Sequence, residues 1–123
     1  MAGSRRLAQV QENDKAVLIY STYPTMEAAE QAGTRLVDQG LAACVNILPG
    51  MTSIYIWQGE RQRDSEVVMV IKTRASLADA VIAEAKSQHP YTNPAFLVLP
   101  VESGAPDFLR WIMEQTRPSA EGR

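Results

Sequence analysis

The single histidine of the chain is the residue whose type most directly suggests chemistry. His89 lies in the stretch QHPYTNPAF, residues 88–96, between a predicted helix and Pro90. Histidine titrates near neutrality and is the commonest protein ligand for metal ions, so His89 is a candidate metal ligand. At a helix end, it would instead satisfy the last carbonyls and interact favourably with the helix dipole. The residues alone leave both interpretations open.

Cys44, the only cysteine, is the second candidate metal ligand. Its thiolate would be a soft ligand suited to Cu(I) or Zn(II). It also lies within the apolar run LAACVNIL, residues 41–48, where a cysteine is more often a small core side chain. One cysteine and one histidine cannot complete a four-ligand site within one subunit. Several subunits would have to pool ligands, or water would have to complete the shell.

A second type of site would hold a small anionic ligand. Lys72 is near the end of the apolar strand predicted at residues 66–73. If that strand ends beside a cleft, Lys72 could hold an anion, with Tyr91 and Trp57 as walls. In the simpler interpretation, Lys72 is a solvated strand end and Tyr91 is a half-buried ring with its hydroxyl in water. Lys72, Tyr91 and Trp57 are therefore candidate ligand-binding residues.

Glu66 is the candidate carboxylate of the same site. It begins the strand that Lys72 nearly ends, and it could pair with that lysine. Arg63 and Asp64 precede it in a polar stretch, so a charge cluster at a hairpin turn is the simpler interpretation. Glu66 is thus the fourth candidate ligand-binding residue.

Signatures of common catalytic and nucleotide-binding sites are absent from the sequence. The chain has no GxxxxGK[ST] phosphate loop and no GxGxxG, HExxH, CxxC or GxSxG motif. Ser87 stands only two residues from His89, which disfavours a hydrolytic triad. We therefore predict that the protein is not an enzyme. The weaker alternative is a small-molecule enzyme that uses His89 as a general base.

Charge and composition restrict the partners and the compartment. The 12 basic and 14 acidic residues give a net charge of -2 and are scattered along the chain, so no nucleic-acid partner is expected. No apolar run approaches the roughly 18 residues needed to cross a bilayer, so no membrane span is expected. A single cysteine excludes an internal disulfide and favours a reducing compartment. We expect a cytoplasmic protein.

The hydrophobic pattern predicts the elements that must position these residues. Short apolar or alternating runs indicate strands, and apolar residues at helical spacing indicate helices. Strands are expected at 16–20, 41–48, 52–59, 66–73 and 95–101, with a bend or bulge at 49–50 and a turn at 60–65. Helices are expected from Thr25 to Gly40, from a cap at Ser76 to about Gln88, and over 107–115. Pro100 favours an edge position or a bulge for the last strand.

The order β-α-β-β-α-β-α, with a hairpin at its centre, predicts an α+β fold. We expect a ferredoxin-like split β-α-β sandwich with an extra C-terminal helix and the helices on one face. A single domain is predicted over 15–116, with loose tails at 1–14 and 117–123. Tyr55 and Trp57 alternate with isoleucines, so both faces of that strand carry apolar side chains. Such a strand needs cover on both faces, which predicts an oligomer.

Five motifs in one order carry a family resemblance. They are LAACVNILPG, TSIYIWQG, EVVMVIKT, QHPYTNPAFLVLPV and FLRWI, and the match extends over residues 17–113. In these motifs the chain resembles the CutA family of divalent-cation tolerance proteins. The resemblance implies a compact homotrimer formed by strand pairing, similar to the PII-like signalling trimers. At two positions near the histidine where the family usually has glutamate, this chain has Thr92 and Ala95.

The resemblance also implies a function. We expect a non-enzymatic homotrimer involved in tolerance of, or response to, divalent metal ions such as copper. It would bind a metal ion or a small ligand at clefts between subunits. No cofactor is expected to be obligatory, although copper or another divalent ion could bind through Cys44 and His89. The alternative is a PII-like signalling or structural trimer that recruits a protein partner.

Overall fold

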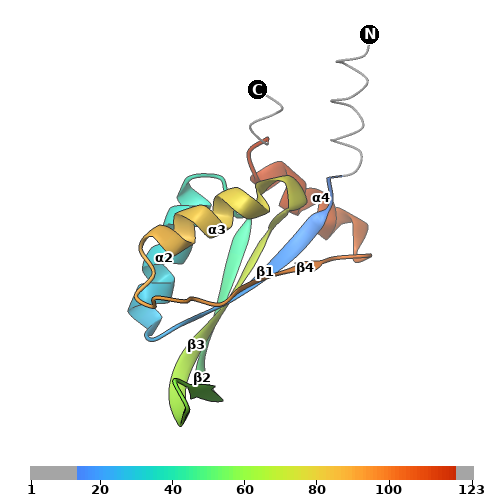
Figure 1. Cartoon of the computed structure of the whole chain (residues 1–123). Helices are drawn as coiled ribbons and strands as arrows, with labels where there is room; N and C mark the ends of the chain where they lie inside the picture. The colour runs from blue at the N-terminus through green and yellow to red at the C-terminus, as the bar shows by residue number, and fades with distance from the viewer. Residues whose placement is uncertain (1–13, 119–123) are drawn as a thin grey trace, which may run out of the picture.

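The computed structural model describes residues 14–118, which form one four-stranded antiparallel sheet and three α-helices (Figure 1). The strands are β1 (Ala16–Tyr23), β2 (Cys44–Trp57), β3 (Glu60–Arg74) and β4 (Phe96–Pro100). The helices are α2 (Met26–Asp38), α3 (Ala78–Ser87) and α4 (Pro106–Gln115), and a 3₁₀ turn, Ala75–Leu77, precedes α3. The predicted element order and the α+β class are confirmed. No helix in this part of the chain is long and apolar enough to cross a bilayer.

The strand order is β2-β3-β1-β4, so β3 lies in the interior of the sheet and β4 lies at an edge. Both placements agree with the sequence. The run at 66–73 is apolar on both faces, as an interior strand requires, and Pro100 lacks the N–H that an interior ladder would use. β1 pairs antiparallel with both β3 and β4, and its Ile19 lies opposite Ile71 and Val98.

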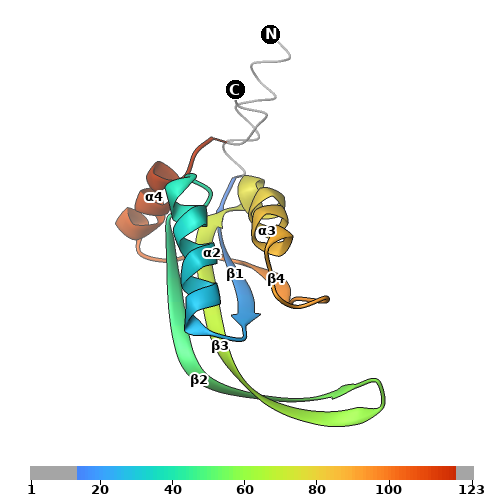
Figure 2. The ribbon, with the colours of Figure 1, turned by 90° about the vertical axis from the view of Figure 1, so that its left-hand side faces the viewer.

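The main core lies between the sheet and the helices α2 and α3, which lie side by side across one face (Figure 2). Side chains alternate along each strand, so Ile19 and Ile71 point to this face and are fully buried. Leu36 of α2 closes the core from the helix side at 0% exposure. Burial of a side chain of this size contributes about 1.5–3 kcal/mol. The predicted start of α2 is confirmed, since Thr25 Oγ1 accepts a 3.1 Å hydrogen bond from the Ala28 N–H.

Helix α4 packs against the opposite face of the sheet, at one end (Figure 1). Its Ile112 is buried against Ala16 and Ala43. Ala16 points away from α2 and α3 because it alternates with the core residue Val17. The expectation that the helices lie on one face is therefore wrong for α4. Elsewhere on this second face, Leu97 of β4 is 61% exposed.

β2 is a single strand where two were predicted. Residues 44–48 and 52–57 of the two predicted runs belong to one ladder, which is interrupted only by a register shift between Leu48 and Met51. Gly50 in this bulge has a φ of +86°, which glycine adopts without the steric cost that a side chain would bring. Of the bend or bulge predicted at 49–50, the structure thus has a β-bulge within a strand.

The hairpin turn comes earlier than predicted. Gln58 and Gly59 connect β2 to β3, and their φ values of 52° and 82° are those of a two-residue hairpin turn. The polar stretch 60–65 is therefore strand instead of turn, with Glu60 paired opposite Trp57. Gln-Gly is a weaker turn signal than Asn-Gly or Asp-Gly, whereas a polar stretch suggests a turn by composition alone. The early turn gives a long hairpin that extends beyond the rest of the sheet (Figure 2).

Asp14, which was expected in the loose N-terminal tail, is bound to the start of the α3 region. The Asp14 carboxylate accepts hydrogen bonds from the Ser76 N–H at 2.9 Å and the Ser76 hydroxyl at 2.6 Å, and it lies 3.4 Å from Arg74 Nη1. Ser76 thus binds Asp14, and α3 has no side-chain cap, so the predicted cap is wrong. Of the predicted tails, residues 1–13 and 119–123 lie outside the described residues.

Candidate functional site

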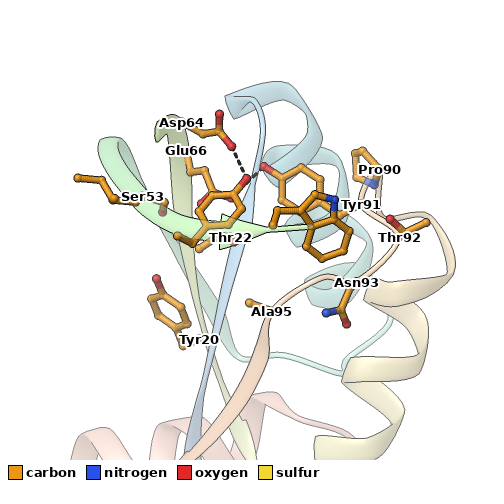
Figure 3. Close-up of a pocket in the computed structure, with 13 residues that line it drawn as sticks. Tyr20, Thr22, Ser53, Asp64, Glu66, Pro90, Tyr91, Thr92, Asn93 and Ala95 are labelled. Carbon is orange, nitrogen blue, oxygen red and sulfur yellow. Dashed lines mark hydrogen bonds between the residues drawn. The ribbon is translucent and has the colours of Figure 1, made fainter. Parts of the chain in front are cut away.

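A cavity of about 710 Å³ opens between the β2–β3 hairpin and the segment that links α3 to β4 (Figure 3). Small-molecule sites commonly have volumes of roughly 300–1,000 Å³. Three of the six candidate site residues, Trp57, Glu66 and Tyr91, line it. The other lining residues are Tyr20, Thr22, Ser53, Ile54, Tyr55, Asp64, Pro90, Thr92, Asn93 and Ala95.

The register of the hairpin gathers the polar lining residues on one face. Ser53 lies directly opposite Asp64, and Met51 lies opposite Glu66. Since side chains alternate between the two faces, Tyr55 points to the same side as Ser53. These pairs follow the bulge between Leu48 and Met51, where the register of β2 against β3 shifts. The hairpin thus presents two carboxylates and an aromatic ring to the same space.

The predicted charge cluster at the turn does not form within one chain. Arg63 lies opposite Ile54, in the positions that alternate with Asp64. Its guanidinium and the Asp64 carboxylate therefore point to opposite faces of the hairpin. None of the ion pairs found among residues 14–118 involves Asp64 or Glu66.

Tyrosine hydroxyls hold the two carboxylates of the cavity. Tyr91 Oη donates to Glu66 Oε2 at 2.8 Å, and Tyr55 Oη donates to Asp64 Oδ2. Burial, with the hydrogen bond to Glu66, raises the pKa of the Tyr91 phenol well above its usual range. The hydrogen bond to Asp64 likewise raises the pKa of Tyr55. Both phenols remain protonated donors, and the partner of Glu66 is Tyr91 instead of a lysine.

His89 does not line the cavity but lies directly behind it, where its ring bonds Thr22 and Tyr91. Its Nε2–H donates to the Thr22 carbonyl at 2.8 Å, and its Nδ1 accepts from the Tyr91 N–H at 3.1 Å. A carbonyl only accepts and an amide N–H only donates, so these bonds define the neutral tautomer with hydrogen on Nε2. The ring also stacks on Tyr23 with centroids 4.3 Å apart. Burial lowers the pKa of His89, which favours the same neutral form.

The predicted position of His89 at a helix end is confirmed, but its ring bonds elsewhere. Its backbone N–H donates to the Lys86 carbonyl at 3.1 Å, just beyond the end of α3. The ring reaches across to β1 instead of binding the last helix carbonyls. Both ring nitrogens are engaged, so a metal ion or a substrate proton would have to displace one of these bonds.

Cys44 and Lys72 lie at the other end of the sheet. They are directly opposite each other in the β2–β3 ladder, and Lys72 Nζ lies 5.1 Å from the centre of the Phe108 ring of α4. Lys72 follows Glu66 by six residues on β3, which is about 20 Å in an extended strand. The predicted anion site that joins Lys72 to the cavity walls therefore does not form within one chain.

The two candidate metal ligands are not neighbours in one chain. Cys44 lies opposite Lys72 of β3, whereas His89 bonds Thr22, which lies opposite Val68. Between residues 14 and 118, no group of three or more His, Cys, Asp or Glu side chains could hold a metal ion. The described part of a single chain thus offers no metal centre with three such ligands, and a site that contains both Cys44 and His89 needs a second copy.

Among the lining residues that sequence analysis did not select as site residues, Asp64 and Tyr55 form a hydrogen bond with each other. A signal for them was present in the alternation of Ser53, Tyr55 and Trp57 along β2. Once the turn is placed at Gln58-Gly59, the same alternation in β3 brings the acidic residues opposite these positions. Because residues 60–65 were predicted to form the turn, Asp64 was not expected to pair opposite Ser53 on this face of the hairpin.

Comparison with known proteins gives one consistent result. The family model described as CutA1 divalent ion tolerance protein matches residues 17–115. The chain belongs to the CutA1 family. The divalent-cation tolerance protein CutA of Thermus thermophilus is 42% identical over 103 residues, which are 84% of this chain and 98% of that protein. The crystal structure of CutA1 from Oryza sativa has a TM-score of 0.83 and 39% identity, covering 85% of this chain and 96% of that chain.

These relatives confirm the predicted family and fold. The chloroplastic protein CutA of Arabidopsis thaliana is 35% identical over 116 residues, 94% of this chain. This chain spans 64% of the length of the Arabidopsis protein. The CutA1 family is named for divalent ion tolerance and not for a reaction.

Proposed function

We propose that this protein is a non-enzymatic homotrimer that takes part in tolerance of divalent metal ions, with copper as the first ion to examine. It binds a metal ion or a small ligand in clefts between subunits. Membership of a family named for divalent ion tolerance supports the role in metal tolerance. The observation that carries the assembly is an apolar surface that one chain leaves exposed.

The exposed apolar side chains lie in two places, at the far end of the hairpin and on β4. Ile54 and Ile56 of the hairpin are 67% and 65% exposed, and Leu97 of β4 is 61% exposed. Large apolar side chains left exposed in groups mark surfaces that contact other molecules. β4 is also an edge strand with backbone groups available for pairing with another chain. We infer that copies of this chain cover one another here, and the CutA resemblance favours three copies.

A cleft at the subunit boundary follows from the same hairpin. Tyr55 and Trp57, which wall the cavity on the hairpin side, are themselves 41% and 46% exposed. A neighbouring copy that covers the hairpin end would therefore also border the cavity. This supports a ligand site that assembly completes.

The metal ligands would have to come from more than one copy. Cys44 is partly exposed and carries a soft sulfur, so it is the stronger candidate for copper. His89 would have to release its hydrogen bond to Thr22 or to Tyr91. The same engagement of both nitrogens disfavours His89 as a general base. We expect no obligatory cofactor, since apolar side chains close the core of the domain.

Assembly and metal binding are tested together. Sedimentation equilibrium should give three copies, and anaerobic competition titration with Cu(I) and Zn(II) should show saturable binding at a fixed stoichiometry per trimer. Cys44→Ala and His89→Ala should each weaken that binding while leaving the trimer intact. A monomer at micromolar concentration contradicts the assembly. Unsaturable metal binding that neither substitution changes contradicts direct metal handling.

The second candidate function is a PII-like signalling or structural trimer that recruits a protein partner. The wide apolar surface and the absence of a metal-ligand cluster within residues 14–118 favour it. In this case, Cys44→Ala and His89→Ala would leave binding of the partner intact. We retain the cytoplasm as the proposed location on the basis of the single cysteine. The chloroplastic name of the Arabidopsis relative shows that the family does not determine the compartment.

A further inference from the structure

The charged groups that line the cavity are all acidic. Among the lining residues that the structure describes, Asp64 and Glu66 are the only ionisable ones apart from tyrosines, and none is a lysine, arginine or histidine. The nearest basic residues of the hairpin, such as Arg63, point to its other face. Lys72 lies at the opposite end of β3. The cavity therefore offers negative charge that no neighbouring side chain of the described chain neutralises through an ion pair.

The two carboxylates of the cavity and the phenols bonded to them are arranged to accept further hydrogen bonds. Each carboxylate receives one phenolic proton, from Tyr55 or Tyr91, and a carboxylate has further lone pairs for a ligand. The phenol oxygens have donated their only protons, so they too can only accept. A ligand that binds these groups must bring its own N–H or O–H donors.

Aromatic rings supply the apolar part of the cavity. Trp57, Tyr55, Tyr91 and Tyr20 all line it, and Figure 3 shows Tyr20 and Tyr91 bordering the same space as the two carboxylates. The face of an aromatic ring attracts a cation and also packs against methylene groups. Aromatic rings beside carboxylates are thus suited to a charged nitrogen carried on a carbon chain.

We propose that this cavity binds a small organic cation, an alkyl amine with protonated nitrogen, through Asp64 and Glu66, with Trp57 and Tyr91 packed against its carbon chain. The proposal rests on the proposed function in taking the cleft as a ligand site, and it names the class of ligand. It replaces the anionic ligand expected from Lys72. Two carboxylates spaced two residues apart on one strand face lie about 6.6 Å apart at their Cα atoms. A flexible diamine can therefore reach both.

The direct test is isothermal titration calorimetry of the full chain with 1,4-diaminobutane near neutral pH. Its uncharged analogue 1,4-butanediol and the dianion succinate are the matched probes. We expect saturable binding of the diamine at one site per chain, weakened by added salt, and no binding of the diol or of succinate. Saturable binding of succinate, or equal binding of diamine and diol, overturns the proposal.

Substitution of the carboxylates connects the binding to this cavity. Glu66→Gln and Asp64→Asn keep the shape and remove the charge, and each should weaken diamine binding about tenfold or more, because hydrogen bonds to charged groups contribute that much. Glu30→Gln removes the same charge from an exposed position of α2 and should leave the affinity unchanged. Far-UV circular dichroism verifies that each variant is folded. Diamine affinity that survives the double substitution Asp64→Asn with Glu66→Gln contradicts the assignment.

The two proposals can fail separately. Sedimentation equilibrium and Zn(II) titration on the same preparation report assembly and metal binding independently of the diamine. A trimer that takes up metal but no diamine overturns the organic-cation site and leaves the proposed function standing. A monomer without metal binding that still binds the diamine through Glu66 supports the cavity assignment and overturns the proposed function.

Discussion

Isoleucines in two regions of the same sheet differ in their exposure to solvent. Ile19 and Ile71 lie under α2 and α3 and are 0% exposed. Ile54 and Ile56 lie in the far part of the hairpin and are 67% and 65% exposed. All four belong to apolar stretches of β-strand, so local sequence does not distinguish them. The difference is that helices of the same chain cover only the first region.

The helix-covered region stabilises the subunit itself, whereas the exposed hairpin region is available to bind other molecules. The helix-covered region completes its own core. In the hairpin, backbone pairing between β2 and β3 maintains the strands, while the apolar side chains remain in contact with solvent. Burial of each exposed isoleucine is worth about 1.5–3 kcal/mol and is available only to another chain or ligand. The candidate ligand cavity lies in this second region.

The largest expected effect is the loss of assembly when the hairpin is made polar. Ile54→Asp combined with Ile56→Asp should convert the proposed trimer to a monomer, because an interface would bury unpaired carboxylates. Sedimentation velocity at micromolar concentration measures this change. The matched control, Gln31→Asp with Thr34→Asp on exposed positions of α2, should stay trimeric. A hairpin variant that remains trimeric shows that this region is not the interface.

Truncation of one isoleucine from each region gives the next largest effect. Ile71→Ala should lower the free energy of unfolding by about 2–5 kcal/mol, since it leaves a cavity in a closed core. Ile56→Ala should change it by at most about 0.5 kcal/mol when the chain is dilute enough to be monomeric. Urea denaturation followed by circular dichroism measures both. Equal losses would mean that the far hairpin is also buried within one chain.

His89 connects the two regions, and its removal should have an intermediate effect. His89→Ala removes the bonds to Thr22 and Tyr91 and the stack on Tyr23, which should cost about 2–3 kcal/mol in stability. His89→Asn retains a planar amide with one donor side and one acceptor side, so it should lose less. The measurement is again urea denaturation. A neutral effect of His89→Ala would show that the ring does not hold the segment between α3 and β4.

The smallest expected effect is a pH dependence that arises from the same ring. Burial lowers the pKa of His89 in the folded protein, so the folded state binds fewer protons than the unfolded state below the ordinary histidine pKa. Stability should therefore be complete above about pH 6.5 and should decline as the pH falls from there toward the lowered folded pKa. The midpoint of thermal unfolding between pH 7.5 and 5 measures it. His89→Asn should have a flatter profile, and identical profiles would exclude His89 as the cause.

Part of the candidate site could be predicted because residue type alone suggested it. His89, Tyr91, Trp57 and Glu66 were selected from the sequence, and the structure places all four in or directly behind the cavity. Their partners were not predictable. The bond from His89 to Thr22 joins positions 67 residues apart, and no local pattern encodes such a contact.

The sequence by itself determined the order of strands and helices, the cap at Thr25, the edge position of β4 and the family. Each of these depends on local periodicity, on the chemistry of single residues such as Pro100, or on motifs along the chain. Only the tertiary structure decided which face α4 covers, where the hairpin turns, and that the partner of Glu66 is Tyr91 and not Lys72. Register and packing between distant segments control these features, and a shift of the turn by a few residues changes every pairing in the hairpin.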